Sequence, residues 1–219
     1  MPSPSNDTDV PSEAAAVARR YQRLERPLVY TVAFLFAGIV GAALFFLPLL
    51  VGLLVAVCAA VLMRIPIFRV KGSTQLVSEC DSETVRSDFQ SATPPVLPFQ
   101  WGIADDIHTT DDGAIYDFSY LLGLRSASMA VEIDSKVADG GDVNNDLELF
   151  VTENENPWAT YVVSIHQHDT ETVVDVEWSS DRRFGLRRLP QRWVAERYRT
   201  EALTAQGFTV VEREASLSL

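Results

Sequence analysis

The hydrophobic pattern of the chain is dominated by one uninterrupted apolar stretch, residues 27–63, which contains no Asp, Glu, Lys, Arg or His. A bilayer core about 30 Å thick takes about 20 apolar residues as one helix, so a stretch of 37 residues exceeds a single span. Pro48 has no backbone N–H and favours a break in the helix at that point. The pattern therefore predicts a transmembrane hairpin of two helices, 27–45 and 48–63.

Basic residues lie on both sides of this apolar stretch. Positive residues near the ends of spans stay on the cytoplasmic side, and a hairpin places both of its ends on one side. The pattern thus predicts a multi-pass protein of the cell membrane, with two spans and a cytoplasmic domain. A signal peptide is not expected, because its apolar region has only about 7–15 residues and this stretch is far longer. The residues expected at the membrane surface are Arg19, Arg20, Arg23, Arg26, Arg64, Arg69 and Lys71.

From residue 116 onward, apolar and polar residues alternate with the period of two that is typical of strands. A two-residue turn at Asp169-Thr170 would pair Tyr161 with Trp178 and Val163 with Val176, so every apolar residue meets an apolar partner. Register and burial agree in this arrangement, as they must when one face of a sheet is buried. The pattern predicts about six antiparallel strands with one apolar face.

Helical signals precede and follow these strands. Asp81 is positioned to cap a short helix over 82–91, and the prolines of 93–98 exclude regular structure there. A longer helix over 189–206 is expected to cover the apolar face of the sheet, and a short strand-like tail follows at 208–214. The apolar stripe of the long helix consists of Trp193, Val194, Tyr198, Ala202 and Ala205.

Together these patterns predict the domain organisation. The N-terminal residues are rich in Ser, Pro, Asn and Asp, a composition typical of disorder. The expected parts are a disordered N-terminus (1–11), a basic juxtamembrane helix (12–26), the transmembrane hairpin (27–63) and a cytoplasmic α+β domain (70–219).

The charge of the chain is unevenly distributed. Residues 72–219 hold 11 basic and 26 acidic residues, a net charge of −15, which disfavours binding to nucleic acid. The basic residues of the whole chain are 16 Arg and only 2 Lys. This composition resembles that of proteins from salt-loving archaea, in which molar salt shortens the Debye length to about 3 Å and makes self-repulsion tolerable.

The order of elements from Val70 to Gln206 resembles the START/Bet v 1-like superfamily, also called SRPBCC or polyketide cyclase-like. In that family a curved antiparallel sheet grips a long C-terminal helix. The resemblance implies an apolar cavity between sheet and helix that holds a lipid or another hydrophobic ligand. The chain departs from the family in its additional segment 208–219 and in its tether, because most members are free soluble domains.

Aromatic residues are expected on the apolar face of this sheet. They would line the cavity that the resemblance implies, with a filled core as the alternative, since protein interiors are generally close-packed. The candidate pocket residues are Trp101, Tyr116, Phe118, Tyr120, Tyr161, Trp178 and Trp193.

An arginine-rich segment, 181–188, is the only basic cluster of the C-terminal domain, and it continues in Arg192, Arg197 and Arg199. It fits either contact with an anionic membrane surface or ion pairs with carboxylates of the domain itself. We expect the ion pairs to prevail in high salt, where screening weakens attraction to a membrane.

No constellation of residues indicates catalysis, a metal or a cofactor. His166 and His168 lie on one strand near Asp175, but two ligands from one strand do not close a metal site. The acidic segment 139–146 lacks the spacing of an EF-hand, and Cys58 and Cys80 are read as small buried residues that do not bridge.

The sequence therefore predicts a membrane-anchored, non-catalytic domain that binds an apolar or lipid-like ligand at the cytoplasmic face. Its expected partners are the lipid bilayer and a hydrophobic small molecule or lipid. The alternative is a structural or interaction module with a fully packed core, recruited to a membrane complex. A third class, an enzyme of the cyclase type, lacks a recognisable acid–base pair.

Overall fold

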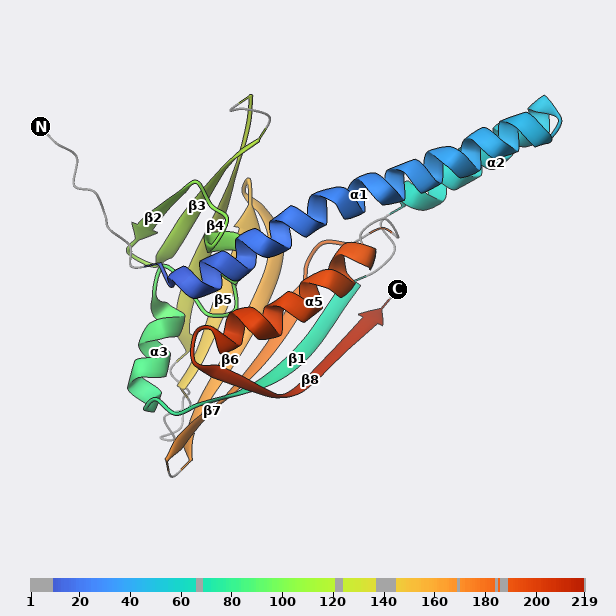
Figure 1. Ribbon diagram of the computed structural model, residues 1–219. Coiled ribbons are helices and arrows are strands. Elements are labelled where there is room, and N and C mark those ends of the chain that lie inside the picture. Colours follow the sequence, from blue (N-terminus) through green and yellow to red (C-terminus); the bar gives the residue numbers. More distant parts are fainter. Residues whose placement is uncertain are drawn as a thin grey trace, which may run out of the picture.

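The computed structural model describes residues 10–65, 69–120, 124–136, 145–168, 170–183, 185 and 189–218. Within these ranges, eight antiparallel strands form one sheet in the order β2-β3-β4-β5-β6-β7-β1-β8 (Figure 1). The strands are β1 (Arg69–Ser78), β2 (Asp106–Thr110), β3 (Gly113–Tyr120), β4 (Arg125–Lys136), β5 (Asn145–Glu153), β6 (Asn156–His168), β7 (Glu171–Ser180) and β8 (Phe208–Ser218).

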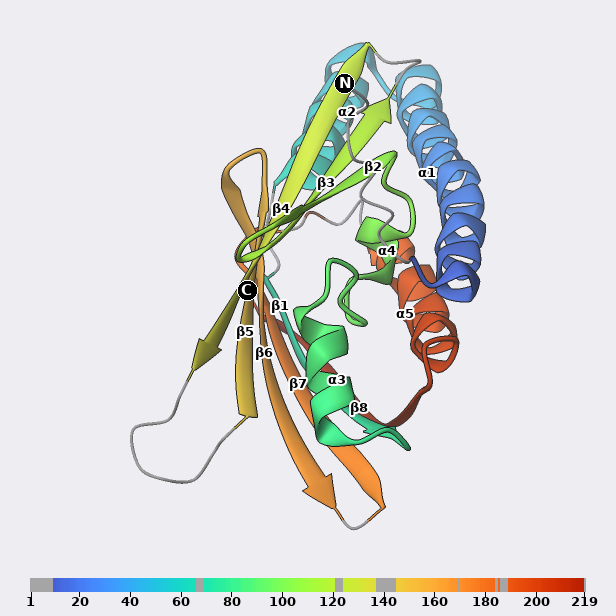
Figure 2. The same cartoon turned by 90° about the vertical axis from the view of Figure 1, so that its left-hand side faces the viewer.

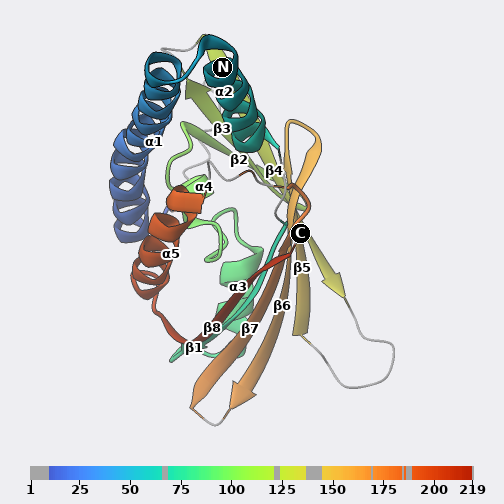
Figure 3. The same ribbon diagram turned by 90° about the vertical axis from the view of Figure 1, so that its right-hand side faces the viewer.

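The helices gather on one side of this twisted sheet, as Figure 2 and Figure 3 show from opposite directions. We call the covered side the inner face and the other side the outer face. The inner face carries the apolar core, whose fully buried members include Leu76, Leu147, Leu149, Val163 and Val174. The helices are α1 (Ser12–Phe46), α2 (Leu49–Arg64), α3 (Ser82–Gln90), α4 (Pro98–Trp101) and α5 (Leu189–Thr204).

The register predicted for the β6–β7 hairpin is confirmed. Tyr161 pairs with Trp178 and Val163 with Val176, and the ladder closes with His168 opposite Glu171. Strict alternation makes this register unambiguous, because a slip by one residue would turn every apolar side chain toward solvent.

Of the two edge strands, β8 was partly predicted from the sequence and β2 was not. β2 was not predicted, since it carries a single apolar residue, Ile107, and pairs only with β3. The predicted tail 208–214 is the first part of β8, which pairs with β1 along its whole length. Phe208 anchors this strand in the core, with its ring centroid 5.9 Å from that of Phe89 on α3.

The first third of α1 belongs to the core of the domain. Ala14, Ala15 and Ala18 are fully or almost fully buried beside α4 and α5. Gly102 leaves room for them, since a Cβ atom on this glycine would lie 2.8 Å from that of Ala18. Tyr21 continues the contact, with its ring centroid 4.7 Å from that of Phe99. The boundary predicted after residue 26 falls inside this continuous helix.

The remainder of α1 and all of α2 form an antiparallel hairpin that projects beyond the sheet (Figure 1). The break lies at Leu47-Pro48, as the proline predicted. At Gly52 the helices approach closely, because a Cβ atom there would lie 2.8 Å from the Ala43 carbonyl oxygen. The hairpin exposes most of its large apolar side chains, including Phe34, Phe45, Phe46, Leu49 and Leu50.

The prediction that this hairpin crosses a membrane twice is wrong. Among the described residues, no helix combines the length and the apolar character that a membrane span requires. α2 has 16 residues, about 24 Å of helix against a bilayer core of about 30 Å. The expected antiparallel sheet is present, but the transmembrane part of the predicted fold class and the multi-pass localisation in the cell membrane are both incorrect.

Candidate ligand-binding site

Three side chains from different elements meet on the inner face of the sheet beneath α5. Tyr161 of β6 and Trp178 of β7 oppose each other across the two strands. Arg199 of α5 lies over them, with its guanidinium carbon 5.5 Å from the centroid of the Trp178 ring. Tyr161 is buried, whereas Trp178 and Arg199 are half-buried. We call these three residues the inner-face cluster.

Trp178 fits at this position because its neighbour on β1 has no side chain. Gly72 pairs with Trp178, and a Cβ atom at Gly72 would lie 2.8 Å from the indole Nε1. The same atom would lie 2.7 Å from the carbonyl oxygen of Glu214 on β8. Both distances are too short for a Cβ atom, so only glycine lets the indole pack over the backbone of β1.

Polar contacts fix α5 above the cluster. Arg213 of β8 forms an ion pair with Glu196 of α5 and also donates a hydrogen bond to its carbonyl oxygen. On the opposite side of the helix, Arg20 of α1 pairs with Glu201 at 2.7 Å. These contacts fix the orientation of α5 about its axis. Arg199 then faces the sheet, on the same side of the helix as the fully buried Ala202 three residues later.

The electrostatics of the cluster are those of a cation in an apolar setting. Burial raises the pKa of the Tyr161 hydroxyl, and the positive charge of Arg199 acts in the opposite direction. The Nε atom of Arg199 is buried and has no hydrogen-bond acceptor in the described part of the chain. The Trp178 ring beneath the guanidinium supplies a cation–π contact, which stabilises the charge without accepting a conventional hydrogen bond.

Other predicted pocket residues lie deeper in the core. Trp101, Tyr116 and Phe118 are buried, and two of them have polar partners. The Trp101 indole donates to the Pro94 carbonyl oxygen, and the Tyr116 hydroxyl donates to that of Ala92, both at 2.9 Å. Burial raises the pKa of Tyr116. The side chains of Tyr120 and Trp193 lie outside the described residues, so the complete pocket stays a prediction.

Sequence reasoning assigned Arg199 to the basic cluster and missed its place beside the pocket residues. The available signal was its spacing. Arg199 precedes Ala202 by three positions, and residues three apart share one face of a helix. Ala202 was already part of the apolar stripe expected to face the sheet.

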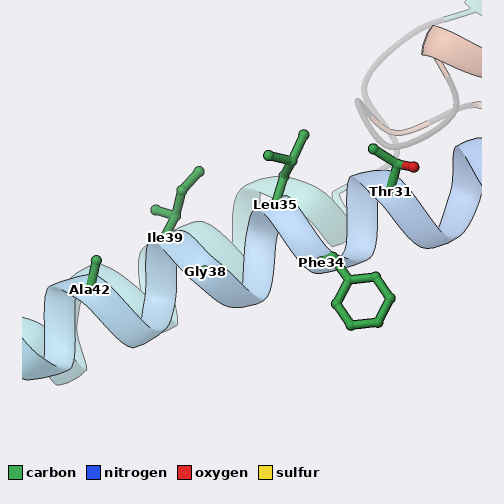
Figure 4. A pocket seen from close by; sticks show the side chains of 6 residues that line it. All are labelled: Thr31, Phe34, Leu35, Gly38, Ile39 and Ala42. Atoms are coloured by element: carbon green, nitrogen blue, oxygen red, sulfur yellow. The ribbon is translucent and has the colours of Figure 1, made fainter.

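An apolar hollow of about 560 Å³ lies along α1 in the projecting hairpin (Figure 4). The Thr31 hydroxyl donates to the Pro27 carbonyl oxygen at 2.9 Å, so the polar atom of this side chain is satisfied within the helix. Phe34 points to a different side of the helix from the other labelled side chains. The hollow is lined by Thr31, Phe34, Leu35, Gly38, Ile39 and Ala42.

A second hollow, of about 640 Å³, lies mainly on the outer face of β1, β6, β7 and β8. Its lining mixes polar and apolar residues and carries charges of both signs, from Lys71, Glu177 and Glu214. Of the predicted pocket residues with described side chains, only Trp178 contributes to either of these two hollows.

The basic residues expected at a membrane surface are distributed over α1, the last residue of α2 and the beginning of β1. Arg19, Arg23, Arg69 and Lys71 are exposed, whereas Arg20 is engaged by Glu201. The side chains of Arg26 and Arg64 lie outside the described residues. Contact of this set with headgroups stays a prediction.

The C-terminal arginine cluster is only partly described. Arg182 forms an ion pair with Glu153, which is the kind of contact expected if the cluster pairs with carboxylates of the domain itself. Arg183 and Arg197 are exposed. Arg187 and Arg188, with the side chain of Arg192, lie outside the described residues.

His166 and His168 are exposed at the C-terminal end of β6. Within the described ranges, no group of three or more His, Cys, Asp or Glu side chains is arranged to hold a metal ion. Most of the acidic segment 139–146 lies outside those ranges. Cys58 and Cys80 are both free and exposed, not buried as expected.

No family model and no curated protein matches the chain. Among solved structures it is similar to the Mll3558 protein from Rhizobium loti, with 15% identity, coverage of 63% of this chain and 96% of that one, and a TM-score of 0.42. A START superfamily protein from Mycobacterium smegmatis shows 12% identity, coverage of 63% and 97%, and a TM-score of 0.39. Ara h 8.0201 shows 8% identity, coverage of 62% and 99%, and a TM-score of 0.34. These TM-scores are low, so the helix-grip description rests on the strand order and helix placement of this chain itself.

Proposed function

We propose that this chain is a non-catalytic helix-grip domain that binds an apolar or lipid-like molecule between the inner face of the sheet and α5. Its projecting hairpin holds the domain at a lipid surface without crossing it. The observation that supports ligand binding is the inner-face cluster. Trp178 and Arg199 remain half-buried on the inner face, whereas Val174 and Val176 on the same face of β7 are buried. Apolar sites with a few placed polar groups are the usual binding sites for small molecules.

Attachment to lipid is supported by the surface of the hairpin. At its turn, Phe45 and Leu50 are 82% and 81% exposed, and the neighbouring Phe46 and Leu49 are also exposed. Monomeric proteins rarely expose contiguous apolar patches of more than a few hundred Å². Exposed basic residues, Arg23, Arg69 and Lys71, lie near its base, where they would meet anionic headgroups. This charge arrangement favours a lipid surface over a second copy of the chain.

Vesicle flotation tests the attachment. Phe45→Ser combined with Phe46→Ser removes apolar contact area at the turn, so this turn variant should remain in the bottom fractions. The wild-type chain should float with anionic vesicles. The matched control replaces two exposed apolar residues elsewhere, Leu124→Ser and Val211→Ser, and should float like the wild type. A wild-type chain that stays at the bottom as a dimer would show that a second copy covers the hairpin.

Fluorescence quenching tests ligand binding at the inner face. A neutral dibrominated acyl alcohol quenches tryptophan only near contact distance. We expect it to quench the full-length turn variant, and Trp178→Phe in the same background should remove the largest share of that quenching. The turn variant is used because it lowers binding of the probe to the hairpin. Quenching that Trp178→Phe leaves unchanged would place the probe elsewhere and contradict the proposal.

A structural or interaction module with a packed core is the second candidate. It is favoured by the end of the core around Trp101 and Tyr116, where both side chains are at most 1% exposed and both polar groups have internal partners. Complete absence of quenching would favour this candidate.

A further inference from the structure

Arg199 is a half-buried cation without an anionic partner in the described part of the chain. Its Nε atom is buried and lacks a hydrogen-bond acceptor. No carboxylate of the described residues lies within ion-pair distance of its guanidinium group. Its guanidinium group lies instead over the Trp178 ring, beside the neutral phenol of Tyr161. Such an arrangement is unfavourable in isolation, because a buried charge needs pairing and hydrogen bonds to offset its desolvation.

The acidic residues of α5 do not serve this purpose. Glu196, three residues before Arg199, forms its ion pair with Arg213 of β8. Glu201, two residues after Arg199, pairs with Arg20 of α1. Both carboxylates hold α5 to neighbouring elements, and the guanidinium beneath the helix is left for another anion.

We propose that Arg199 binds the anionic head group of an amphipathic ligand whose acyl chain lies along the inner face. This inference rests on the proposed function and specifies its ligand class as a single-chain amphiphile with a carboxylate or a phosphate. The planar guanidinium donates through Nε and the Nη atoms and matches both groups in a two-bond geometry. Trp178 occupies one face of the guanidinium, so the donors at its edge remain for the ligand.

Three probes with the same chain and different ends test this assignment. They are oleate, oleyl phosphate and oleyl alcohol, titrated in nonionic detergent against the full-length chain and its variants. Wild type should bind the two anions at least about tenfold more tightly than the alcohol, as charge-assisted hydrogen bonds require. Arg199→Gln should abolish this preference and retain alcohol binding. Because detergent affects wild type and variant equally, the comparison cancels partitioning of each probe. The stronger of the two anions identifies the head group.

The matched control is Arg197→Gln, which removes an exposed charge from the same helix and should keep the preference. Arg199→Lys keeps the positive charge but loses the planar guanidinium group, so it should retain part of the preference for anionic probes. The midpoint of thermal unfolding adds a second readout. A cation that serves a ligand is not needed for folding, so Arg199→Gln without ligand should unfold no earlier than wild type.

The outcomes separate this inference from the proposed function. Equal affinity for acid, phosphate and alcohol in both wild type and Arg199→Gln would overturn the head-group site and leave a site for neutral apolar molecules. A lowered unfolding midpoint in Arg199→Gln with unchanged relative affinities would make Arg199 a purely structural residue and likewise overturn it. Failure of all three probes to bind wild type would overturn the proposed function as well.

Discussion

At the scale of single residues, Gly72 determines whether the indole of Trp178 can occupy the inner face. A methyl group at Gly72 would lie 2.8 Å from the indole and 2.7 Å from the backbone of β8. We expect Gly72→Ala to lower the free energy of unfolding by about 1–3 kcal/mol, the usual cost of overpacking. Urea denaturation measures it.

The control for this variant is Ser73→Ala, which changes an exposed side chain on the adjacent position of the same strand. Its effect should stay within about 0.5 kcal/mol. Equal denaturation midpoints for the Gly72 and Ser73 variants would show that the indole does not lie over β1.

Tyr116 makes the stability of the domain sensitive to alkali. Burial raises its pKa in the folded chain, so its contribution to stability is complete below the unfolded pKa of about 10 and is lost as pH rises toward the folded pKa. Tyr116→Phe should lose about 1 kcal/mol at pH 7, because its hydrogen bond to Ala92 disappears. Above pH 10 its unfolding free energy should fall less steeply than that of wild type.

Denaturant titrations between pH 8 and about 12 compare these slopes, with the exposed Tyr30→Phe as the control that should follow wild type. The other groups that titrate in this range are tyrosines, cysteines and 2 lysines, and wild type and Tyr116→Phe share them, so their effects cancel in the comparison. Parallel pH profiles for wild type and Tyr116→Phe would contradict the burial of a neutral phenol at this site.

At the scale of elements, the first third of α1 acts as a structural part of the domain. Ala18 is fully buried and faces Gly102, whereas Ala16 on the same helix is exposed. We expect Ala18→Leu to destabilise the domain by about 1–3 kcal/mol, because the added carbons have no space. Ala16→Leu should be nearly neutral. Urea denaturation that shows the same small effect for both would mean that α1 does not pack on α4.

The elements that the sequence predicted well are those with a strong local period. The alternation in β6 and β7 fixed their pairing, and Pro48 marked the break between α1 and α2. β2 has only one apolar residue and gave no such signal. The docking of α1 was missed because alanines followed by several arginines resemble a helix at a membrane surface.

At the scale of the whole molecule, the long apolar stretch was a strong signal that led to an incorrect topology. It correctly indicated an apolar hairpin, but apolar character alone did not reveal that α2 has 16 residues or that α1 begins inside the domain. The candidate site was also only partly predictable from the sequence. Aromatic positions follow from alternation, whereas Arg199 reaches Trp178 only through the position and rotation of α5, which contacts with α1 and β8 determine.

Under the proposed function, the space between the sheet and α5 holds an apolar or lipid-like molecule. Native mass spectrometry of the full-length turn variant, Phe45→Ser with Phe46→Ser, can detect this molecule, because the variant lowers the binding of lipid to the hairpin. We predict a complex heavier than the chain by the mass of one hydrophobic molecule, which organic extraction then releases. A spectrum of the bare chain, unchanged after incubation with acyl probes, would contradict the account.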